Sequence, residues 1–113
     1  SMPFPADDSA ERMYAGQCAA LNLEAVPQYR FAADDGRAWR ADFAFLAARV
    51  LVEIDGGIWT RGAHGRPTDI VRNMRKQNHA ARMGWRTLRF SPEDVRSGLA
   101  LEETCAALRW RFK

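Results

Sequence analysis

The stretch QYRFAADDGRAWRADFAFLAARVLVEIDGG, residues 28–57, decides the fold, because its apolar and polar residues alternate with a period of two. That period is typical of β-strands that bury one face. The pattern predicts three strands, at residues 29–31, 39–45 and 50–54. We therefore expect two consecutive hairpins in the first half of the chain.

Two turns set the register of these strands. Gly36 supplies the left-handed residue of a three-residue loop, so the first hairpin pairs residue 29 with 41 and residue 31 with 39. An even loop around residues 47–48 then pairs 45 with 50, 43 with 52 and 41 with 54. These six residues are all apolar and would share one face of the sheet, which supports the register.

The second hairpin also brings two carboxylates together. Its register places Asp42 directly opposite Glu53 on the other face, where Cβ atoms are about 4.5–5.5 Å apart. Like charges at that spacing are destabilising unless a positive charge lies between them. Hard oxygen ligands of this kind suit Mg²⁺ or Mn²⁺. The alternative is that one of these carboxylates pairs with Arg30 or Arg40.

The remaining sequence predicts helices around a fourth strand. Ser9 is typical of a helix N-cap, and Thr68 is expected to cap a second helix that ends at Gly84. Residues 85–90 form a short strand, parallel to its neighbour because a helix connects the two. Ser91-Pro92 starts a final helical region that extends to Phe112. The prediction is a single α/β domain in the order αβββαβα, with a mixed central sheet flanked by helices and a flexible start at residues 1–8.

Composition narrows the class of protein. The chain has 113 residues, 47% of them apolar and 27% charged, which is enough for one compact core. No apolar run approaches the roughly 18 residues that span a bilayer, so no membrane association is expected. Two cysteines are too few for a disulfide framework, which favours a reducing, cytoplasmic location.

Charge is unevenly distributed along the chain. Residues 1–55 contain nine acids and five arginines, whereas residues 56–90 contain eight basic residues and one acid. A basic segment beside an acidic edge suits a polyanion held near a cation site, which points to DNA. The alternative is a solvated, salt-bridged helix.

Four segments carry a resemblance to a known family. They are WRADFAF, VLVEIDGGIWTRGAHGR, KQN and GWRTLRF, within about residues 38–90. The acidic residues and their order resemble the PD-(D/E)XK nuclease superfamily. The segments resemble most the small bacterial and phage endonuclease-like proteins related to very-short-patch-repair endonucleases and Holliday-junction resolvases. The resemblance implies a restriction-endonuclease-like fold in a bacterial or phage-encoded protein.

The same resemblance implies a site and an activity. Asp42 and Glu53 would bind the metal together with the backbone carbonyl of Ile54, and the activity would be cleavage of nucleic-acid phosphodiesters. Glu11 matches an acid of the first helix that some members use at the metal, although it also suits a helix N-terminus. Asp55 stands where the motif has its lysine. It is either a further site residue or a partner of Arg40 across the strands.

Two residues are candidates to replace the motif's lysine. Lys76 is the lysine of the KQN segment in a chain with only one other lysine. The expected packing stripe of this helix contains Ile70, Met74, Gln77 and Ala81. It places Lys76 on the opposite, solvated side, which argues against this role. His64 is the other candidate, because a histidine can act as a general base near neutral pH. Its match to the family is loose.

Contacts to DNA are expected from the loop and helix that follow the third strand. Trp59 can stack on or wedge into bases, although a tryptophan after a strand is often a core residue. The expected phosphate contacts are Arg61, Arg66, Arg72 and Arg75. Trp39, Trp85 and Phe90 are expected in the core.

The leading hypothesis is a small Mg²⁺- or Mn²⁺-dependent DNA endonuclease, structure-specific or nicking, in repair, recombination or phage biology. An alternative is a non-catalytic nucleic-acid-binding module on the same fold, because Asp55 replaces the lysine. A further alternative is a homodimer or a subunit that needs a partner protein, since 113 residues offer little surface to hold a duplex.

Overall fold

The computed structural model describes residues 8–55 and 67–109. Its elements, in chain order, are α1 (Ser9–Ala20), β1 (Val26–Tyr29), the 3-10 helix η1 (Ala33–Asp35), β2 (Ala41–Phe45), β3 (Val50–Ile54), α2 (Pro67–Arg82), β4 (Arg86–Phe90), α3 (Pro92–Ser97) and α4 (Leu99–Arg109). The α/β class and the predicted order are confirmed. The final helical region is divided, because Gly98 adopts a left-handed conformation with φ of 90° between α3 and α4.

The four strands form one mixed sheet in the order β1-β2-β3-β4. The pairs Phe43 with Val52 and Phe45 with Val50 confirm the predicted register of β2 against β3. β4 is parallel to β3, and Glu53 there pairs with Arg89. Glu53 therefore lies on a central strand, between β2 on one side and β4 on the other.

Of the two residue pairs predicted for the first hairpin, only one forms. Tyr29 pairs with Ala41 as predicted, but β1 runs back to Val26 and residues 37–40 are not in a strand. Gly36 has the predicted left-handed conformation, with φ of 73°, at the end of η1. The predicted pair of residues 31 and 39 does not form, because Trp39 packs against His79 of α2 with 5.6 Å between ring centroids.

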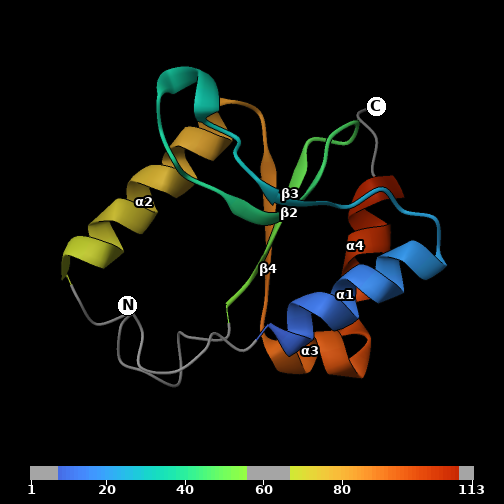
Figure 1. The fold of residues 1–113 in the computed structure, drawn as a ribbon. Helices are drawn as coiled ribbons and strands as arrows, with labels where there is room; N and C mark the ends of the chain where they lie inside the picture. The colour runs from blue at the N-terminus through green and yellow to red at the C-terminus, as the bar shows by residue number, and fades with distance from the viewer. Residues whose placement is uncertain (1–7, 56–66, 110–113) are drawn as a thin grey trace.

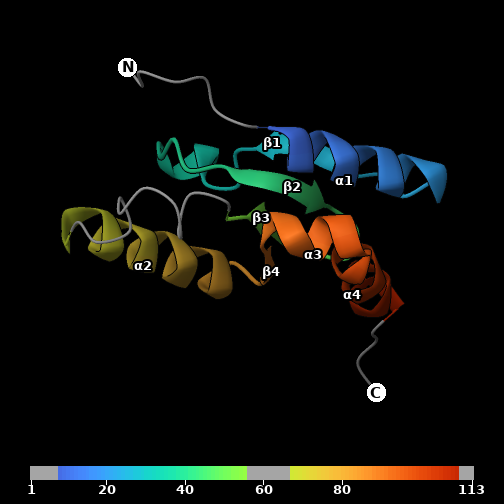
Figure 2. The ribbon, with the colours of Figure 1, turned by 90° about the horizontal axis from the view of Figure 1, so that it is seen from below.

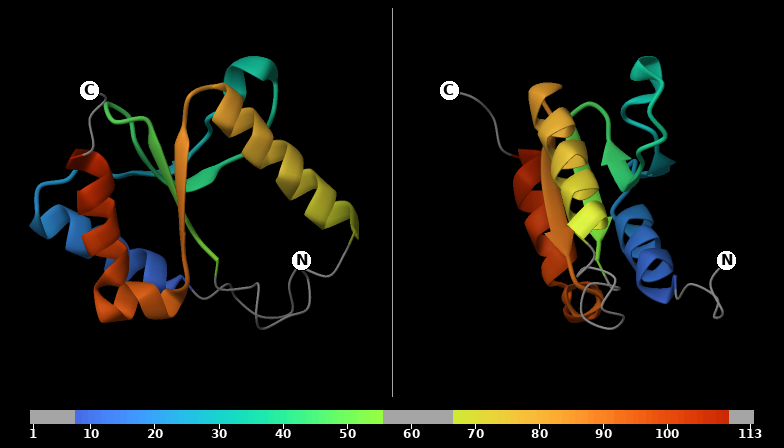
Figure 3. Two further views of the ribbon diagram at one scale, coloured as in Figure 1. Left: turned by 180° about the vertical axis from the view of Figure 1, so that it is seen from behind. Right: turned by 90° about the vertical axis from the view of Figure 1, so that its left-hand side faces the viewer.

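Helices cover the two faces of the sheet unequally. α1, α3 and α4 contact one another, and α2 lies on the other side of the strands (Figure 1). A view from behind shows the same separation of α2 from the other three helices (Figure 3). Within the three-helix layer, α1 lies on the β2 side, with Tyr14 against Phe43, and α3 lies on the β4 side (Figure 2). The sheet is therefore buried on one face by a broad layer and on the other by a single helix.

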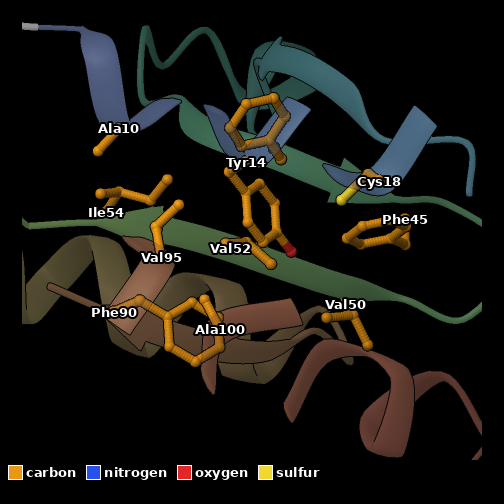
Figure 4. Packing of buried hydrophobic residues seen from close by; sticks show 11 residues of the cluster. Ala10, Tyr14, Cys18, Phe45, Val50, Val52, Ile54, Phe90, Val95 and Ala100 are labelled. Atoms are coloured by element: carbon orange, nitrogen blue, oxygen red, sulfur yellow. The ribbon is translucent and has the colours of Figure 1, made fainter. Parts of the chain in front are cut away.

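The main core lies between the sheet and the three-helix layer. Its buried residues include Val50, Val52 and Ile54 of β3, with Tyr14 and Val95 from the helices (Figure 4). Full burial of such side chains contributes roughly 1.5–3 kcal/mol each. The Tyr14 hydroxyl and Thr104 Oγ1 are 2.7 Å apart inside this core, so their polar atoms are satisfied.

A smaller apolar cluster lies beneath the end of α2. It contains Ala41, Ala44, Leu51, Ala80 and Trp85, with Tyr29 and Phe31 packed against it. The expectation that Ala41 shares the face of Phe43 is wrong. Gln28, the β1 residue next to Tyr29, has a φ of 49°, which interrupts the regular alternation where β1 meets the start of β2.

The predicted packing face of α2 is right for Gln77, which contacts Glu53 of the sheet, and wrong for Ile70 and Met74. Ile70 and Met74 have exposed fractions of 45% and 58%, whereas Ala80 is buried and Lys76 is half-buried. α2 begins at Pro67, so Thr68 lies inside the helix and does not cap it; Gly84 follows as the predicted stop. The side of α2 that faces the sheet is therefore mostly polar: Lys76 and Gln77 contact Glu53 there.

At the chain start, Asp8 precedes α1 as its N-cap, and residues 1–7 of the predicted flexible start lie outside the described residues. Among the helices that the structure describes, none is long and apolar enough to cross a membrane.

Candidate active site

Asp42 and Glu53 come from the two central strands and face one cleft. The β2–β3 register, extended by one residue beyond the pair of Phe43 and Val52, places them opposite each other as predicted. Both side chains line a cleft of about 470 Å³ that is bordered by Trp39, Arg72, Asn73 and Lys76. We call this the carboxylate cleft. The pairing of β2 with β3 thus places the carboxylates of Asp42 and Glu53 at one concave surface, although Glu53 itself is only 8% exposed.

Glu53 is held by two residues of α2. Lys76 Nζ donates to Glu53 Oε1 at 2.6 Å, and Gln77 Nε2 donates to Oε2 at 3.0 Å. The Lys76 and Glu53 side chains are 19% and 11% exposed, so water screens this ion pair little. The sequence interpretation that placed Lys76 on the solvated side of its helix is therefore wrong, because the helix turns its polar side to the sheet.

Asp42 is fixed by the backbone of the neighbouring strand. The N–H of Ile54 donates to Asp42 Oδ2 at 2.7 Å. In an extended strand, the N–H and C=O of one residue point to the same neighbouring strand. The carbonyl of Ile54 therefore lies on the Asp42 side of β3, which is where its predicted role as a ligand requires it.

Asp42 is partly removed from water and lies near other carboxylates. Burial raises the pKa of Asp42; the hydrogen bond from Ile54 works in the opposite direction, and the charge of Glu53 raises the pKa further. Burial also raises the pKa of Glu11, and Asp42 adds to the increase. Glu11, in the first turn of α1, is thus electrostatically coupled to Asp42. This interaction is what the expected role of Glu11 requires.

Asp55 is paired on the β4 side of the site. Arg89 Nε donates to Asp55 Oδ2 at 2.7 Å, so the partner is Arg89 and not the predicted Arg40. β2 begins only at Ala41, and Arg40 therefore does not continue the ladder to Asp55. Asp55 is not among the residues that line the carboxylate cleft.

Trp39 was expected in the core and is instead half-buried at the edge of the cleft. The guanidinium of Arg37 lies over its ring, 4.7 Å from the centroid. His79 contacts the same ring, and its Nε2 is 3.2 Å from Asp35 Oδ2. Of the other expected core residues, Trp85 and Phe90 are buried. The alternation of apolar residues gave no signal that the chain would leave the ladder before Trp39.

The residues present fit a hard divalent cation. In the described part of the chain, no group of three or more His, Cys, Asp or Glu side chains could hold a metal ion. Mg²⁺, however, is commonly bound through one or two carboxylates, with water and substrate phosphate as its other ligands. Asp42 and Glu53 supply two carboxylates, and each carboxylate oxygen can accept more than one contact. Burial and mutual repulsion give the pair a physical reason to bind a cation.

Several predicted residues lie outside the described part of the chain. These are Trp59, Arg61, His64 and Arg66. Arg72 and Arg75 lie on α2 and are exposed, and Arg72 borders the carboxylate cleft. Asn73 and Arg89 are site neighbours that the sequence did not predict, and Gln77 was predicted only as a packing residue. The KQN segment was the available signal for Gln77.

Comparison with known proteins shows similarity at the level of fold. No protein-family model matches the chain, and no curated protein matches its sequence. Among solved structures, the chain is similar to the catalytic domain of the homing endonuclease I-Bth0305I, with a TM-score of 0.63 and 12% identity. The match covers 88% of this chain and 91% of that domain. Nearly the whole domain therefore has the fold of an endonuclease catalytic domain.

Proposed function

We propose that this protein is a metal-dependent endonuclease that hydrolyses DNA phosphodiester bonds with a PD-(D/E)XK-type site. The observation that carries the proposal is that Asp42 and Glu53 face one cleft while Lys76 donates to Glu53. The lysine that the motif would place at Asp55 is then supplied by α2. The fold shared with a homing endonuclease catalytic domain supports the same activity.

Each residue of the site has a proposed task. Asp42, Glu53 and the Ile54 carbonyl would hold Mg²⁺ or Mn²⁺, with Glu11 adding negative charge beside Asp42. Such an ion neutralises charge on a phosphate and lowers the pKa of a bound water. Gln77 acts as a positioning residue, because its hydrogen bond fixes the second oxygen of Glu53.

Lys76 has the task closest to the reacting phosphate. Hydrolysis forms a bond from a water oxygen to phosphorus and breaks one P–O bond, while the proton lost by water balances the proton that the leaving oxygen gains. Negative charge therefore grows on the phosphate oxygens. The ammonium of Lys76 borders the same cleft and can stabilise this charge as a point cation.

One observation favours the second candidate, a non-catalytic nucleic-acid-binding module. Lys76 and Gln77 engage both oxygens of Glu53, so the carboxylate is already neutralised and hydrogen-bonded by the protein itself. A module of this kind would bind DNA in a salt-sensitive manner, without turnover and without dependence on a divalent metal.

Plasmid nicking with Mg²⁺ or Mn²⁺, alongside calorimetric titration of the same ions, separates the two candidates. We expect Asp42→Ala and Glu53→Ala each to abolish ion binding and nicking together. Nicking that persists in both variants overturns the proposed site. DNA binding by the wild type without ion binding or nicking favours the binding module.

A further inference from the structure

A second cavity adjoins the carboxylate cleft. It has a volume of about 530 Å³ and lies between the start of α2 and the segment that leads into β2. Trp39 and Arg72 line both hollows, so the second cavity begins where the carboxylate cleft ends. We call it the arginine cavity, because Arg37, Arg72 and Arg75 border it together with Trp39 and Val71.

The arginine cavity is positively charged, whereas the lining of the carboxylate cleft balances Asp42, Glu53 and Asp69 against Arg40, Arg72 and Lys76. Three guanidinium groups border it, and none of its described lining residues is acidic. Within residues 8–55 and 67–109, neither Arg37 nor Arg75 has a carboxylate partner, and Arg72 has only the half-buried Asp69 at 3.7 Å. Pro67 and Thr68 add the N-terminal end of α2, where the helix dipole favours an anion. The cavity is therefore built for a group with negative charge.

Trp39 gives the cavity an aromatic wall. Arg37 lies over the ring at 4.7 Å, and stacking of this kind holds a guanidinium plane while its edge can still donate to oxygen acceptors. Val71 and Pro67 supply apolar surface beside the three cations. Cations that contact phosphate, combined with aromatic or apolar contact for sugar and base, are the composition of grooves that bind single nucleic-acid strands.

We infer that the arginine cavity is a nucleotide subsite of the proposed nuclease. It takes the phosphate next to the scissile one in the same strand, and the attached nucleoside lies against Trp39 and Val71. This inference rests on the proposed function, since the carboxylate cleft defines where the scissile phosphate lies. Trp39 then lies between the binding positions of two neighbouring nucleotides. Such a site favours a DNA strand that is single-stranded or locally opened where it is cleaved.

Binding of a mononucleotide in the absence of metal and cleavage tests the subsite separately from catalysis. Thymidine 5′-monophosphate is titrated with EDTA present, so that no divalent cation can bring its phosphate to Asp42 and Glu53. The indole resonance of Trp39, assigned with Trp39→Phe, is followed by NMR. We expect Arg75→Gln to weaken binding about tenfold, because one charge-assisted hydrogen bond to phosphate is lost. Thymidine, which lacks phosphate, should leave the resonance unchanged.

The matched control removes the same charge elsewhere. Arg109 is exposed at the end of α4, in the helix layer on the opposite side of the sheet from α2. Arg109→Gln should bind thymidine 5′-monophosphate within about twofold of the wild type. Equal affinity of the Arg75→Gln and wild-type proteins, or equal binding of thymidine and its monophosphate, overturns the subsite whether or not the protein cleaves DNA.

A second measurement links the subsite to the cut. In a single-stranded oligonucleotide with one preferred cleavage position, a methylphosphonate replaces each phosphate in turn. We expect neutralisation of one phosphate adjacent to the cut to slow the wild type about tenfold and to leave Arg75→Gln nearly unaffected. Equal slowing of both proteins contradicts the inference. Absence of any cleavage contradicts the proposed function and leaves the binding result to decide on the subsite.

Discussion

Lys76 Nζ donates to Glu53 Oε1 at 2.6 Å, across a sequence separation of 23 residues. The pair joins the centre of α2 to the centre of the sheet at a point where Glu53 has almost no access to water. Such a pair is costly to break from one side, because the remaining charge stays buried. It is therefore both a structural link and, in the proposed nuclease, the functional centre.

The two members of this pair should differ in their effect on stability. Lys76→Met leaves the Glu53 carboxylate buried, with Gln77 as its one remaining side-chain partner in the described part of the chain, and we expect a loss of about 3 kcal/mol in the free energy of unfolding. Glu53→Gln keeps the volume of the side chain and lets the long Lys76 side chain turn to water, so the loss should stay below about 1.5 kcal/mol. Urea unfolding of both variants measures the difference. Equal losses would show that Lys76 does not neutralise Glu53.

The sequence predicted the strands that carry the acids, but not the orientation of the helix that completes the site. The register of Phe43 with Val52 follows from apolar alternation alone, because a shift of one residue would expose the whole strand face. Lys76 was misplaced because a helical wheel assigns the apolar side to the interior. In α2 this rule fails, since the helix covers the sheet where the sheet presents Glu53.

Trp39 was misplaced for a related reason. Its position depends on contacts between segments far apart in sequence: His79 of α2 against its ring, and Asp35 beside His79. Local alternation contains no information on those contacts. The arginine cavity was therefore not predictable from the sequence, although Arg72 and Arg75 were predicted to contact phosphate.

Gln77 should influence metal affinity without touching the metal. Its amide fixes the Oε2 atom of Glu53, and loss of a hydrogen bond to a ligand typically lowers metal affinity 10- to 100-fold. We expect Gln77→Ala to weaken Mn²⁺ binding about tenfold in a calorimetric titration. Asn78→Ala is the matched control, because Asn78 is the next residue on the same helix and is exposed. If the two variants bind Mn²⁺ equally well, Gln77 has no positioning role.

The charged carboxylate of Asp42 should lower the stability of the fold, although the proposed metal site requires it. Burial and the charge of Glu53 raise the pKa of Asp42 above its ordinary value of 3.8, so the folded state disfavours the charged form. This cost is present above the raised pKa and disappears as the pH falls through it. Asp42→Asn should therefore raise the Tm by about 2–5 °C at pH 7, and the gain should vanish towards pH 3. Thermal unfolding between pH 3 and 8 tests this, and a lower Tm at pH 7 would contradict it.

The same shift predicts how metal binding depends on pH. A ligand carboxylate must lose its proton before it binds a cation. Mn²⁺ affinity should therefore fall on acidification at a pH above the ordinary value of 3.8 for an aspartate. Titration calorimetry at a series of pH values measures the midpoint. A midpoint at or below 3.8 would show that Asp42 is not the titrating ligand.

Asp55 should contribute to the fold more than to metal binding. Its carboxylate is engaged by Arg89 at 2.7 Å and is absent from the lining of the carboxylate cleft. We expect Asp55→Asn to keep Mn²⁺ affinity within about threefold, because Asp42 and Glu53 remain in place. Its unfolding free energy should fall by about 1 kcal/mol, since the ion pair is only partly buried.

Two reference variants make the result on Asp55 decisive. Glu53→Gln should lose Mn²⁺ affinity at least 100-fold, while Glu93→Gln on α3 removes the same charge at an exposed position that is not part of the carboxylate cleft. If Asp55→Asn behaves like Glu93→Gln, the residue at the motif's lysine position is a partner of Arg89. If it behaves like Glu53→Gln, Asp55 is a metal ligand, and Arg89 must release it when the ion binds.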